Sequence, residues 1–367
     1  MKNQTINQRL LSLDFMRGLI MVLLMLESTR LYDNLFEVTK DTSFDFLFIQ
    51  FFHHEWNGLR FWDLVQPGFM FMAGTAMAYS LHRQQVNGMK WSESFLKILR
   101  RSGWLFFFGV LDYAVRPSGL SFELWDVLTQ LSFTTLVAFL IFRWSYTNQI
   151  LFSFGLLLLT EILYRFVNVP GFDQAFTDQH NFGNYVDLLL MNKINSGGWV
   201  AINCIPTAAH TIWGVLAGKL LLSDKPGNEK IKWLVISGVA GLIIGFAMDA
   251  TITPIIKRIA TSSFTLASGG WCLLALALFY WWIDIKEHKK HLNFFVIVGM
   301  NSLFIYLFFE IVASRWFNDY IGAITNGLMG MINLPHALMA IITSLVIFAL
   351  EWNLCRFLYK KGIFFKV

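Results

Sequence analysis

Two adjacent histidines stand just before a long apolar segment, in the run FFHHEWNGLRFWDLVQPGFMFMAG at 51–74. A neutral imidazole near pH 7 can take a proton from an amine or a hydroxyl, so His53 and His54 are candidate general bases. The Asn-Gly pair at Asn57 predicts a turn, and Asp63 stands where a carboxylate can cap a helix or orient a histidine. An interfacial histidine pair without chemistry is the alternative. Such a polar helix entrance is tolerated in a membrane mainly against protein or water, which favours a site.

Prolines are expected to interrupt two apolar segments. Pro67 follows Asp63 by about one turn, and Pro206 lies in GGWVAINCIPTAAHTIWGVLAGKLL at 197–221, so each would free a backbone carbonyl within a span. Polar residues near Pro206 form one predicted stripe lining a cavity: Asn203, Thr207 and His210. A packing histidine with satisfied hydrogen bonds is the alternative interpretation of His210.

The first apolar segment carries two charged pairs at helical spacing. Asp14 and Arg17 share one helix face, where they form either a ligand contact or an ion pair that sets topology. Glu27 stands three residues before Arg30. A carboxylate within a span is costly unless it faces the bundle interior and has a partner. Glu27 is therefore expected to face inward, where it fixes Arg30 or orients an acceptor.

Later segments add further polar groups. TPIIKRIATSSF (253–264) reads as a basic, hydroxyl-rich helix entrance, and Asn301 and Glu310 lie inside the apolar run GMNSLFIYLFFE. Polar groups on several spans predict an internal aqueous or substrate cavity. Cations near the cytoplasmic ends of two spans either grip an anionic ligand or only set topology: Lys97, Arg100, Arg101 and Lys219.

Composition identifies the elements that must position these groups. The 367 residues are 56% hydrophobic and 14% charged, whereas soluble domains are about a quarter charged. The apolar runs are continuous, which indicates membrane-spanning helices and makes an alternating barrel a poor alternative. We expect an all-α polytopic membrane protein, a single transmembrane domain over 1–367 with about ten helices. The predicted spans are 14–35, 61–82, 102–116, 126–143, 148–167, 198–222, 232–250, 263–284, 293–315 and 336–358.

Charge placement predicts the orientation. With both termini cytoplasmic, about two thirds of the 29 Lys and Arg residues face the cytoplasm, as the positive-inside rule requires. This orientation puts His53 outside, and it explains the net charge of +5 without a nucleic acid partner. No cleavable signal peptide is apparent. The cysteines lie in apolar segments without metal-ligand spacing, so neither a disulfide nor a metal site is expected at Cys204, Cys272 and Cys355.

These residues together resemble a known family, the transmembrane acyltransferases related to lysosomal heparan-α-glucosaminide N-acetyltransferase. The resemblance rests on SLDFMRGL (12–19), HHEWNGLRFWDLVQPGFMFMAG (53–74), INCIPTAAHTIWGVLAGKLL (202–221), TPIIKRIATSSFTL (253–266) and VGMNSLFIYLFFE (298–310). It implies transfer of an acetyl group from cytoplasmic acetyl-CoA, as co-substrate, to the amine of a glucosamine on the far side. It also implies a homodimer, no metal, and a multi-pass protein of the bacterial inner membrane. The acceptor would be a heparan sulfate-type fragment, another amino sugar or a cell-envelope glycan.

The match is uneven at the functional positions. The family's essential histidine stands three residues before the Trp of W-N-G-L, which is His53 before Trp56 here. Where the family has an asparagine late in the first span, this chain has Glu27 and Ser28. A second acyltransferase family begins with an Asp…Arg-Gly helix and has a histidine eleven residues after that Arg. Ser28 occupies that position after Arg17, which argues against membership.

The sequence thus predicts a transmembrane acyltransferase in which His53 is either a general base or a transient acetyl carrier. Asn57 and Asn301 are candidate donors to the tetrahedral intermediate, and Asp63 and His54 complete the catalytic candidates. Acceptor contacts are assigned to Glu27, Ser28, Arg30, Trp56, His210, Asn301 and Glu310. Acetyl-CoA contacts are assigned to Asp14, Arg17, Lys97, Arg100, Arg101 and Lys219. The alternatives are a permease for a small polar solute, with the polar stripe lining its path, and a structural or sensory membrane protein.

Overall fold

The computed structural model describes residues 10–116 and 119–365, and these residues are helical with no β-strand beyond one isolated bridge. They form two compact units. The first contains residues 53–287 with the short segment 10–13, and the second contains 14–52 with the segment from 288 onward. Each unit is described by itself below.

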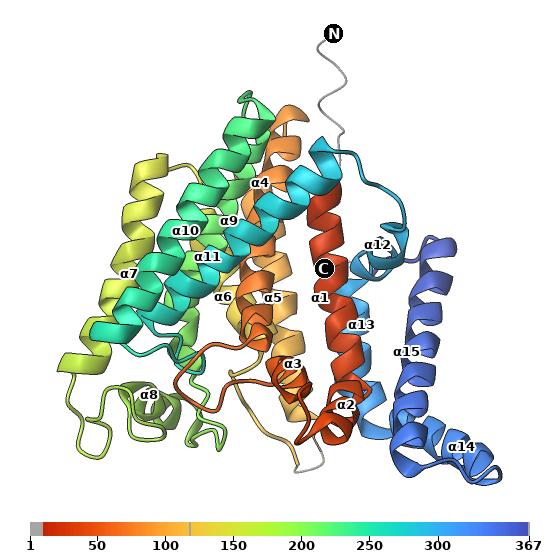
Figure 1. The fold of residues 1–367 in the computed structure, drawn as a ribbon. Helices are drawn as coiled ribbons and strands as arrows, with labels where there is room; N and C mark the ends of the chain where they lie inside the picture. Colours follow the sequence, from red (N-terminus) through yellow and green to blue (C-terminus); the bar gives the residue numbers. More distant parts are fainter. Residues whose placement is uncertain (1–9, 117–118, 366–367) are drawn as a thin grey trace. The chain divides into compact units, whose positions relative to one another are not determined.

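The first unit is a bundle of long helices (Figure 1). Its α-helices are α4 (Val65–Val86), α5 (Trp91–Ala114), α6 (Val127–Leu140), α7 (Tyr146–Phe166), α8 (Phe182–Met191), α9 (Cys204–Leu222), α10 (Gly227–Thr251) and α11 (Ser262–Phe279). Short turns extend three of them: η2 (Phe61–Leu64) before α4, η3 (Ala201–Asn203) before α9 and the π-helical η4 (Tyr280–Ile285) after α11. The closest neighbours are α4 with α9, α10 with α11, and α5 with α6.

Small residues hold α4 against α9 at the centre of this bundle. A Cβ added to Gly74 would lie 1.9 Å from the carbonyl oxygen of Thr211, and one added to Gly214 would lie 2.0 Å from that of Phe71. Only glycine permits backbones to approach so closely, a common way of packing helices in lipid. The loop that carries the candidate histidines leads through η2 into α4. The close packing of α4 on α9 therefore fixes the position of the C-terminal end of this loop.

The second unit contains the beginning and the end of the chain. Its helices are α1 (Leu11–Ser28, whose first three residues belong to the first unit), α2 (Leu31–Thr39), α3 (Asp45–Phe48), α12 (Asn293–Gly299), α13 (Ser302–Phe308), α14 (Asn318–Gly330) and α15 (His336–Lys360), with η1 (Ile49–Phe51) and the π-helical η5 (Phe309–Phe317). Here α1 meets α12 at Gly18, where a Cβ would lie 2.1 Å from the carbonyl oxygen of Phe295.

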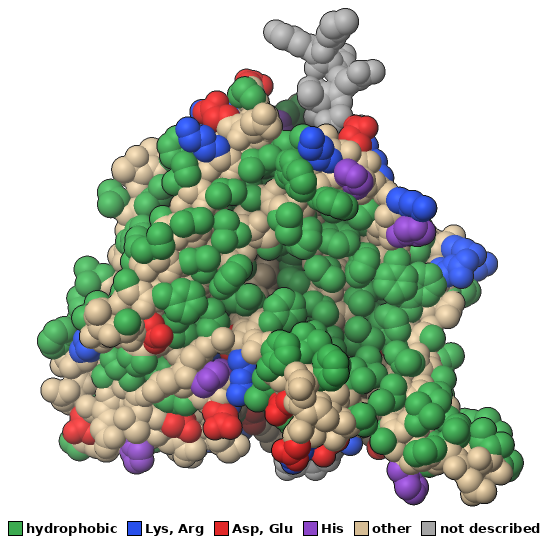
Figure 2. Space-filling view, viewed as in Figure 1, with side chains coloured by type: hydrophobic (Ala, Val, Ile, Leu, Met, Phe, Trp, Pro, Cys, Tyr) green, Lys and Arg blue, Asp and Glu red, His purple; other side chains and the backbone are tan. Residues whose placement is uncertain are grey.

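All ten predicted spans fall on helices. Within the described residues, five helices are long and apolar enough to cross a membrane, and a sixth span results if the bent pair beginning with α12 is counted. The five are α7, η3 with α9, α10, α11 with η4, and α15. Figure 2 shows hydrophobic side chains over the flanks of the first unit's helices and charged ones toward the helix ends. The coarse prediction of an all-helical, multi-pass membrane protein is therefore confirmed.

Several predicted boundaries were wrong. The first span ends at Ser28, because Arg30 adopts φ 61° and separates α1 from α2. The third begins at Trp91 rather than at residue 102, since the charged first half of α5 is helical too. The ninth is broken at Asn301, between helices that bend by 73°. Of the cations used for orientation, Lys2, Arg9 and Lys366 lie outside the described residues.

The two prolines do not interrupt their helices, contrary to the sequence-based expectation. Pro67 is the third residue of α4, and Pro206 is the third residue of α9. Each proline lies where a 3₁₀ turn, η2 or η3, passes into the α-helix, so its missing N–H removes no bond from the regular α-helical ladder that follows. Cys204, Cys272 and Cys355 form no disulfide in the part of the chain that the structure describes.

Candidate active site

Asp63 organises the loop that carries the two histidines. Its carboxylate is fully buried at the start of η2. Oδ2 accepts hydrogen bonds from the backbone N–H groups of Arg60 (2.9 Å) and His54 (3.3 Å), while Oδ1 lies 3.1 Å from Nδ1 of His53. One carboxylate therefore caps the helix entrance and holds the imidazole, the two tasks that the sequence suggested for it.

Lys257 joins this pair from a loop far away in the sequence. Its Nζ lies 2.9 Å from Nδ1 of His53, 3.4 Å from Nε2, and 3.7 Å from Oδ1 of Asp63, and its side chain is only 6% exposed. The two loops are tied by a backbone hydrogen bond from Gly58 N–H to the carbonyl of Ile255, at 2.8 Å. The result is a compact cluster of imidazole, carboxylate and ammonium.

Trp199 covers the same cluster from a third loop. Its ring lies 5.7 Å from that of His53, nearly perpendicular at 75°, and Nζ of Lys257 stands 5.1 Å from its centre, in cation–π range. Arg258 donates to the carbonyl of Gly197 and so fixes the segment before Trp199. Three segments distant in sequence thus converge on His53.

Asp187 of α8 fixes the other side of the Trp199 loop. One carboxylate oxygen accepts from the backbone N–H of Ala201 and the other from Nε1 of Trp125, both at 2.9 Å. Burial raises the pKa of Asp187 to about 7, against the effect of these two donors. The loop is therefore attached to α8 by a carboxylate that is easily protonated.

Burial and charge set the protonation of the cluster. Desolvation first, and then the nearby charge of Lys257, lower the pKa of His53 to about 4, although the hydrogen bond with Asp63 opposes both. For Asp63, burial would raise the pKa, but His53, Lys257 and the Arg60 N–H outweigh it and lower the pKa. At neutral pH the imidazole is uncharged beside a carboxylate. With 37% of its side chain exposed, His53 keeps a face open to an incoming group.

The tautomer of His53 depends on whether Asp63 or Lys257 forms the hydrogen bond with Nδ1. A neutral imidazole has one N–H donor and one acceptor nitrogen. If Nδ1 carries the proton, it donates to Asp63, and Nε2 is the unprotonated nitrogen, 3.4 Å from Nζ of Lys257. If Lys257 donates to Nδ1, the proton sits on Nε2 instead. Asp63 therefore favours a proton on Nδ1, whereas Lys257 favours a proton on Nε2.

The neighbours of His53 in the sequence have other contacts. The ring of His54 packs under Gly58, where a Cβ would lie 2.6 Å from its Nε2, so only the backbone of His54 joins Asp63. Trp56 donates from Nε1 to the carbonyl of Phe176 at 2.8 Å. Asn57 is exposed on the same loop, bridged to the strand-like segment at Ile256.

The side chains of the predicted polar stripe near Pro206 are packed inside the bundle. Asn203, Thr207 and His210 are fully buried, with no accessible surface. Nε2 of His210 contacts the carbonyl of Thr265 and the hydroxyl of Ser268, at 3.0 and 2.9 Å. These bonds join α9 to α11 through Nε2, while Nδ1 of His210 is buried without a hydrogen-bond partner among the described residues.

The predicted acetyl-CoA contacts of the first unit lie toward the opposite ends of the helices. Lys97 and Arg100 are exposed and Arg101 is half-buried in the first half of α5, which follows the end of α4 remote from Asp63. Lys219 lies near the end of α9, with Nζ 4.1 Å from the ring centre of Phe142. The 22 residues of α4 rise about 33 Å at 1.5 Å per residue, and this length separates Asp63 from the cations of α5.

The remaining candidates belong to the second unit. Asp14 and Arg17 form the predicted ion pair, at 3.9 Å. Glu27 is exposed in the last turn of α1, so the expectation that it faces the bundle interior was wrong. The cause is the early end of this helix, which leaves Glu27 at its terminus rather than within a span.

Four other candidates of the second unit serve its local structure. The carbonyl of Ser28 accepts from Nδ2 of Asn318 at 2.8 Å, and Arg30 forms the left-handed link between α1 and α2. Asn301 is buried, and its Nδ2 donates to the carbonyl of Ile363. Glu310 lies in the π-helical segment η5.

Two residues that the sequence did not single out are therefore central, Lys257 and Trp199. Lys257 lies inside TPIIKRIATSSF, a basic helix entrance that also contributes to the family resemblance, but neither feature assigns a role to this lysine. A buried carboxylate such as Asp63 needs a charged or hydrogen-bonding partner. The sequence contains 29 Lys and Arg residues and does not show which of them is that partner. The chain matches no protein-family model, and no curated protein matches it.

Proposed function

We propose that this protein is a membrane acyltransferase that moves the acetyl group of acetyl-CoA onto the amine of a glucosamine-type sugar. The observation that carries the proposal is the accessible His53 imidazole, held through Nδ1 by buried Asp63 and kept uncharged at neutral pH. The resemblance of the motifs around it to transmembrane N-acetyltransferases supplies the donor and the class of acceptor.

The proposed reaction forms an amide C–N bond and breaks the thioester C–S bond. The acceptor nitrogen attacks the acetyl carbon, and the electron pair of the C–S bond leaves with the sulfur of coenzyme A. The proton of the amine passes through Nε2 of His53 to that sulfur, so the histidine is regenerated. The carboxylate of Asp63 stabilises the transient imidazolium. The positive charge of Lys257 destabilises it, which favours release of the proton to the sulfur.

Lys257 has a second proposed task in the same step. Attack on the thioester places negative charge on the carbonyl oxygen, and preorganised donors in a dry site stabilise such charge strongly. The ammonium of Lys257, buried beside the imidazole, is suited to that oxygen, with exposed Asn57 as a further donor from the same rim. A covalent route, in which His53 carries the acetyl group, uses the same residues.

We further propose that the donor binds at the opposite aqueous face, where Lys97, Arg100, Arg101 and Lys219 offer positive charge to its phosphates. Coenzyme A is too large and too charged to cross lipid, so a protein passage is the physical reason for a membrane-embedded transferase.

Purified protein given labelled acetyl-CoA and glucosamine tests the proposal. We expect labelled N-acetylglucosamine from the wild type and none from His53→Ala. Uptake of a polar solute into vesicles without any product from acetyl-CoA would instead support a permease.

A further inference from the structure

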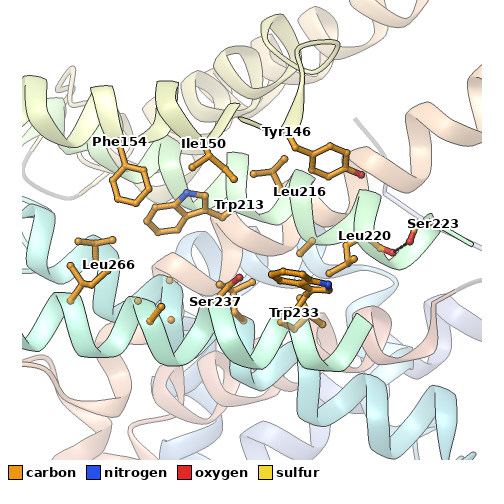
Figure 3. Close-up of a pocket in the computed structure, with 18 of the residues that line it drawn as sticks. Tyr146, Ile150, Phe154, Trp213, Leu216, Leu220, Ser223, Trp233, Ser237 and Leu266 are labelled. Atoms are coloured by element: carbon orange, nitrogen blue, oxygen red, sulfur yellow. Dashed lines mark hydrogen bonds between the residues drawn. The ribbon is translucent and has the colours of Figure 1, made fainter. Parts of the chain in front are cut away.

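An apolar groove runs along the flank of the first unit, between α7, α9, α10 and α11 (Figure 3). Its volume is about 720 Å³, within the range of small-molecule sites. Figure 3 shows Phe154 and Ile150 from α7 opposite Trp213 from α9. The groove arises because α7 packs on α9 while α10 packs on α11, so α7 and α10 leave the surface between them open.

The groove has the depth of one membrane leaflet. It follows α9 from Trp213 to Ser223, a rise of about 15 Å at 1.5 Å per residue. A hydrocarbon core is about 30 Å thick, so this length is roughly half of it. Its apolar walls are open to the surroundings, since the lining residues Ile244 and Phe154 stay 45% and 44% exposed.

Apolar groups close the deep end. The indole of Trp213 is fixed by a hydrogen bond from Nε1 to the hydroxyl of Ser153, at 2.9 Å, which leaves its carbon face toward the groove. The ring packs against Gly269, where a Cβ would lie 2.4 Å from it. Such a surface suits a hydrocarbon chain better than the amide-bearing arm of coenzyme A, whose polar groups would lose hydrogen bonds there.

The shallow end is polar and basic. Tyr146, Ser223 and Lys225 line it, and Nζ of Lys219 lies 5.7 Å from the ring centre of Tyr146. The segments 143–146 and 219–232 carry Arg143, Lys219, Lys225, Lys230 and Lys232 against Asp224 and Glu229. Of these, Lys225 is paired with Glu229, and Lys230 donates to the carbonyl of Leu221. Basic pockets between membrane helices on the cytoplasmic side recognise anionic lipid headgroups.

We infer that this groove binds one acyl chain of an anionic phospholipid from the leaflet at the Lys219 end, with the lipid phosphate at the basic mouth. This lipid site shares Lys219 with the donor site proposed above, but none of the lining residues of the groove belongs to the His53 cluster. The apolar length selects a single chain of leaflet depth, and the surplus of cations selects a negative headgroup over a zwitterionic one.

Lipid retention by the purified protein tests this inference. The protein is exchanged into detergent containing equal amounts of phosphatidylglycerol and phosphatidylcholine with identical chains, and bound lipid is counted by native mass spectrometry. We expect at least about tenfold preference for phosphatidylglycerol, which corresponds to 1.4 kcal/mol. Ala240→Trp, which fills the groove, should abolish retention, whereas Val239→Trp on the neighbouring face of α10 should not.

A second measurement uses the wild-type protein, so that its result does not depend on whether Ala240→Trp folds. Phosphatidylglycerol with a photoreactive acyl chain should label peptides from 146–154, 213–223 and 233–244 above all others. Equal retention of both lipids would overturn the inference, as would equal retention by both tryptophan variants or labelling spread evenly over the helices. Labelling of the groove by a photoreactive coenzyme A that competes with lipid would also overturn it.

Discussion

Nζ of Lys257 lies 2.9 Å from Nδ1 of His53, the same ring nitrogen that Asp63 contacts at 3.1 Å. In a simple carboxylate–histidine pair, only the carboxylate would act on that nitrogen and would fix its proton there. Here an ammonium opposes it. The chemistry of His53 consequently depends on both neighbours, and each can be removed separately.

Replacing His53 tests the assignment of the base. His53→Ala should lower the transfer rate by about 10²–10⁴-fold, the usual contribution of general acid–base catalysis. The folded protein should persist in detergent, because this loop side chain is 37% exposed. His54→Gln is the control, since the His54 ring packs under Gly58 rather than against the cluster. Equal losses in both variants, measured with saturating substrates, would contradict the assignment.

Removing Lys257 should move the acid limb of the pH–rate profile. The pKa of His53 is about 4 and is lowered in part by Lys257, so the wild type should stay active well below pH 6. Lys257→Met should raise the pKa of His53 toward its ordinary 6.5, shifting the limb to higher pH. Asp63→Asn should shift it the other way, because Asp63 raises that pKa. Identical limbs in all three proteins would exclude His53 as the titrating group.

The same pKa predicts how acid affects folding. The unfolded chain protonates His53 near pH 6.5, whereas the folded one does so only near pH 4. As the pH falls through this window, the unfolded state binds a proton that the folded state does not, so stability is lost. His53→Gln should reduce the fall in melting temperature between pH 6.5 and pH 4. A fall unchanged from the wild type would show that other groups cause it.

Gly58 should be needed for both the fold and the site. Its φ is +141° and a Cβ there would meet the His54 ring, so Gly58→Ala should cost about 1–3 kcal/mol and displace the histidine loop. Gly88→Ala is the matched control, since φ is +75° there but no atom lies within 4 Å of the added Cβ. We expect the control to be less stable yet fully active. Unfolding monitored by intrinsic fluorescence, together with activity, separates the two, and an active Gly58→Ala protein would contradict the prediction.

The cations of α5 should affect the binding of acetyl-CoA and not the binding of the sugar. Arg100→Ala combined with Arg101→Ala should raise the KM for acetyl-CoA about tenfold, equivalent to 1.4 kcal/mol of lost phosphate contact. The KM for the sugar should stay unchanged. Lys361→Ala, at a position exposed like that of Arg100, serves as the control. An unaltered KM for acetyl-CoA would leave these arginines as determinants of topology.

The sequence predicted more of the helices than of the contacts between them. Apolar length located the segment at 61–82 and Asp63 at its entrance, because both signals are local. The position of Pro206 in a first turn was missed, since hydropathy does not reveal where a helix begins within an apolar run. Glu27 was misplaced for the same reason, at the other end of a helix.

The candidate site was predictable only where its residues are neighbours in the chain. His53 and Asp63 are ten residues apart, and a capping carboxylate beside a histidine was a reasonable expectation. Lys257 is 204 residues from His53, and no periodicity connects a basic loop to a histidine loop. Trp199 was likewise one of 14 tryptophans. Only the packing of α4, α9 and α11 brings these loops together.

The most direct test places donor and acceptor in separate compartments. Sealed vesicles containing the protein are loaded with labelled acetyl-CoA, and glucosamine is supplied only outside. The account predicts labelled N-acetylglucosamine outside, lost in His53→Ala, and little product when both substrates are outside and the lumen is empty. Product formed only when both substrates share one compartment would contradict it.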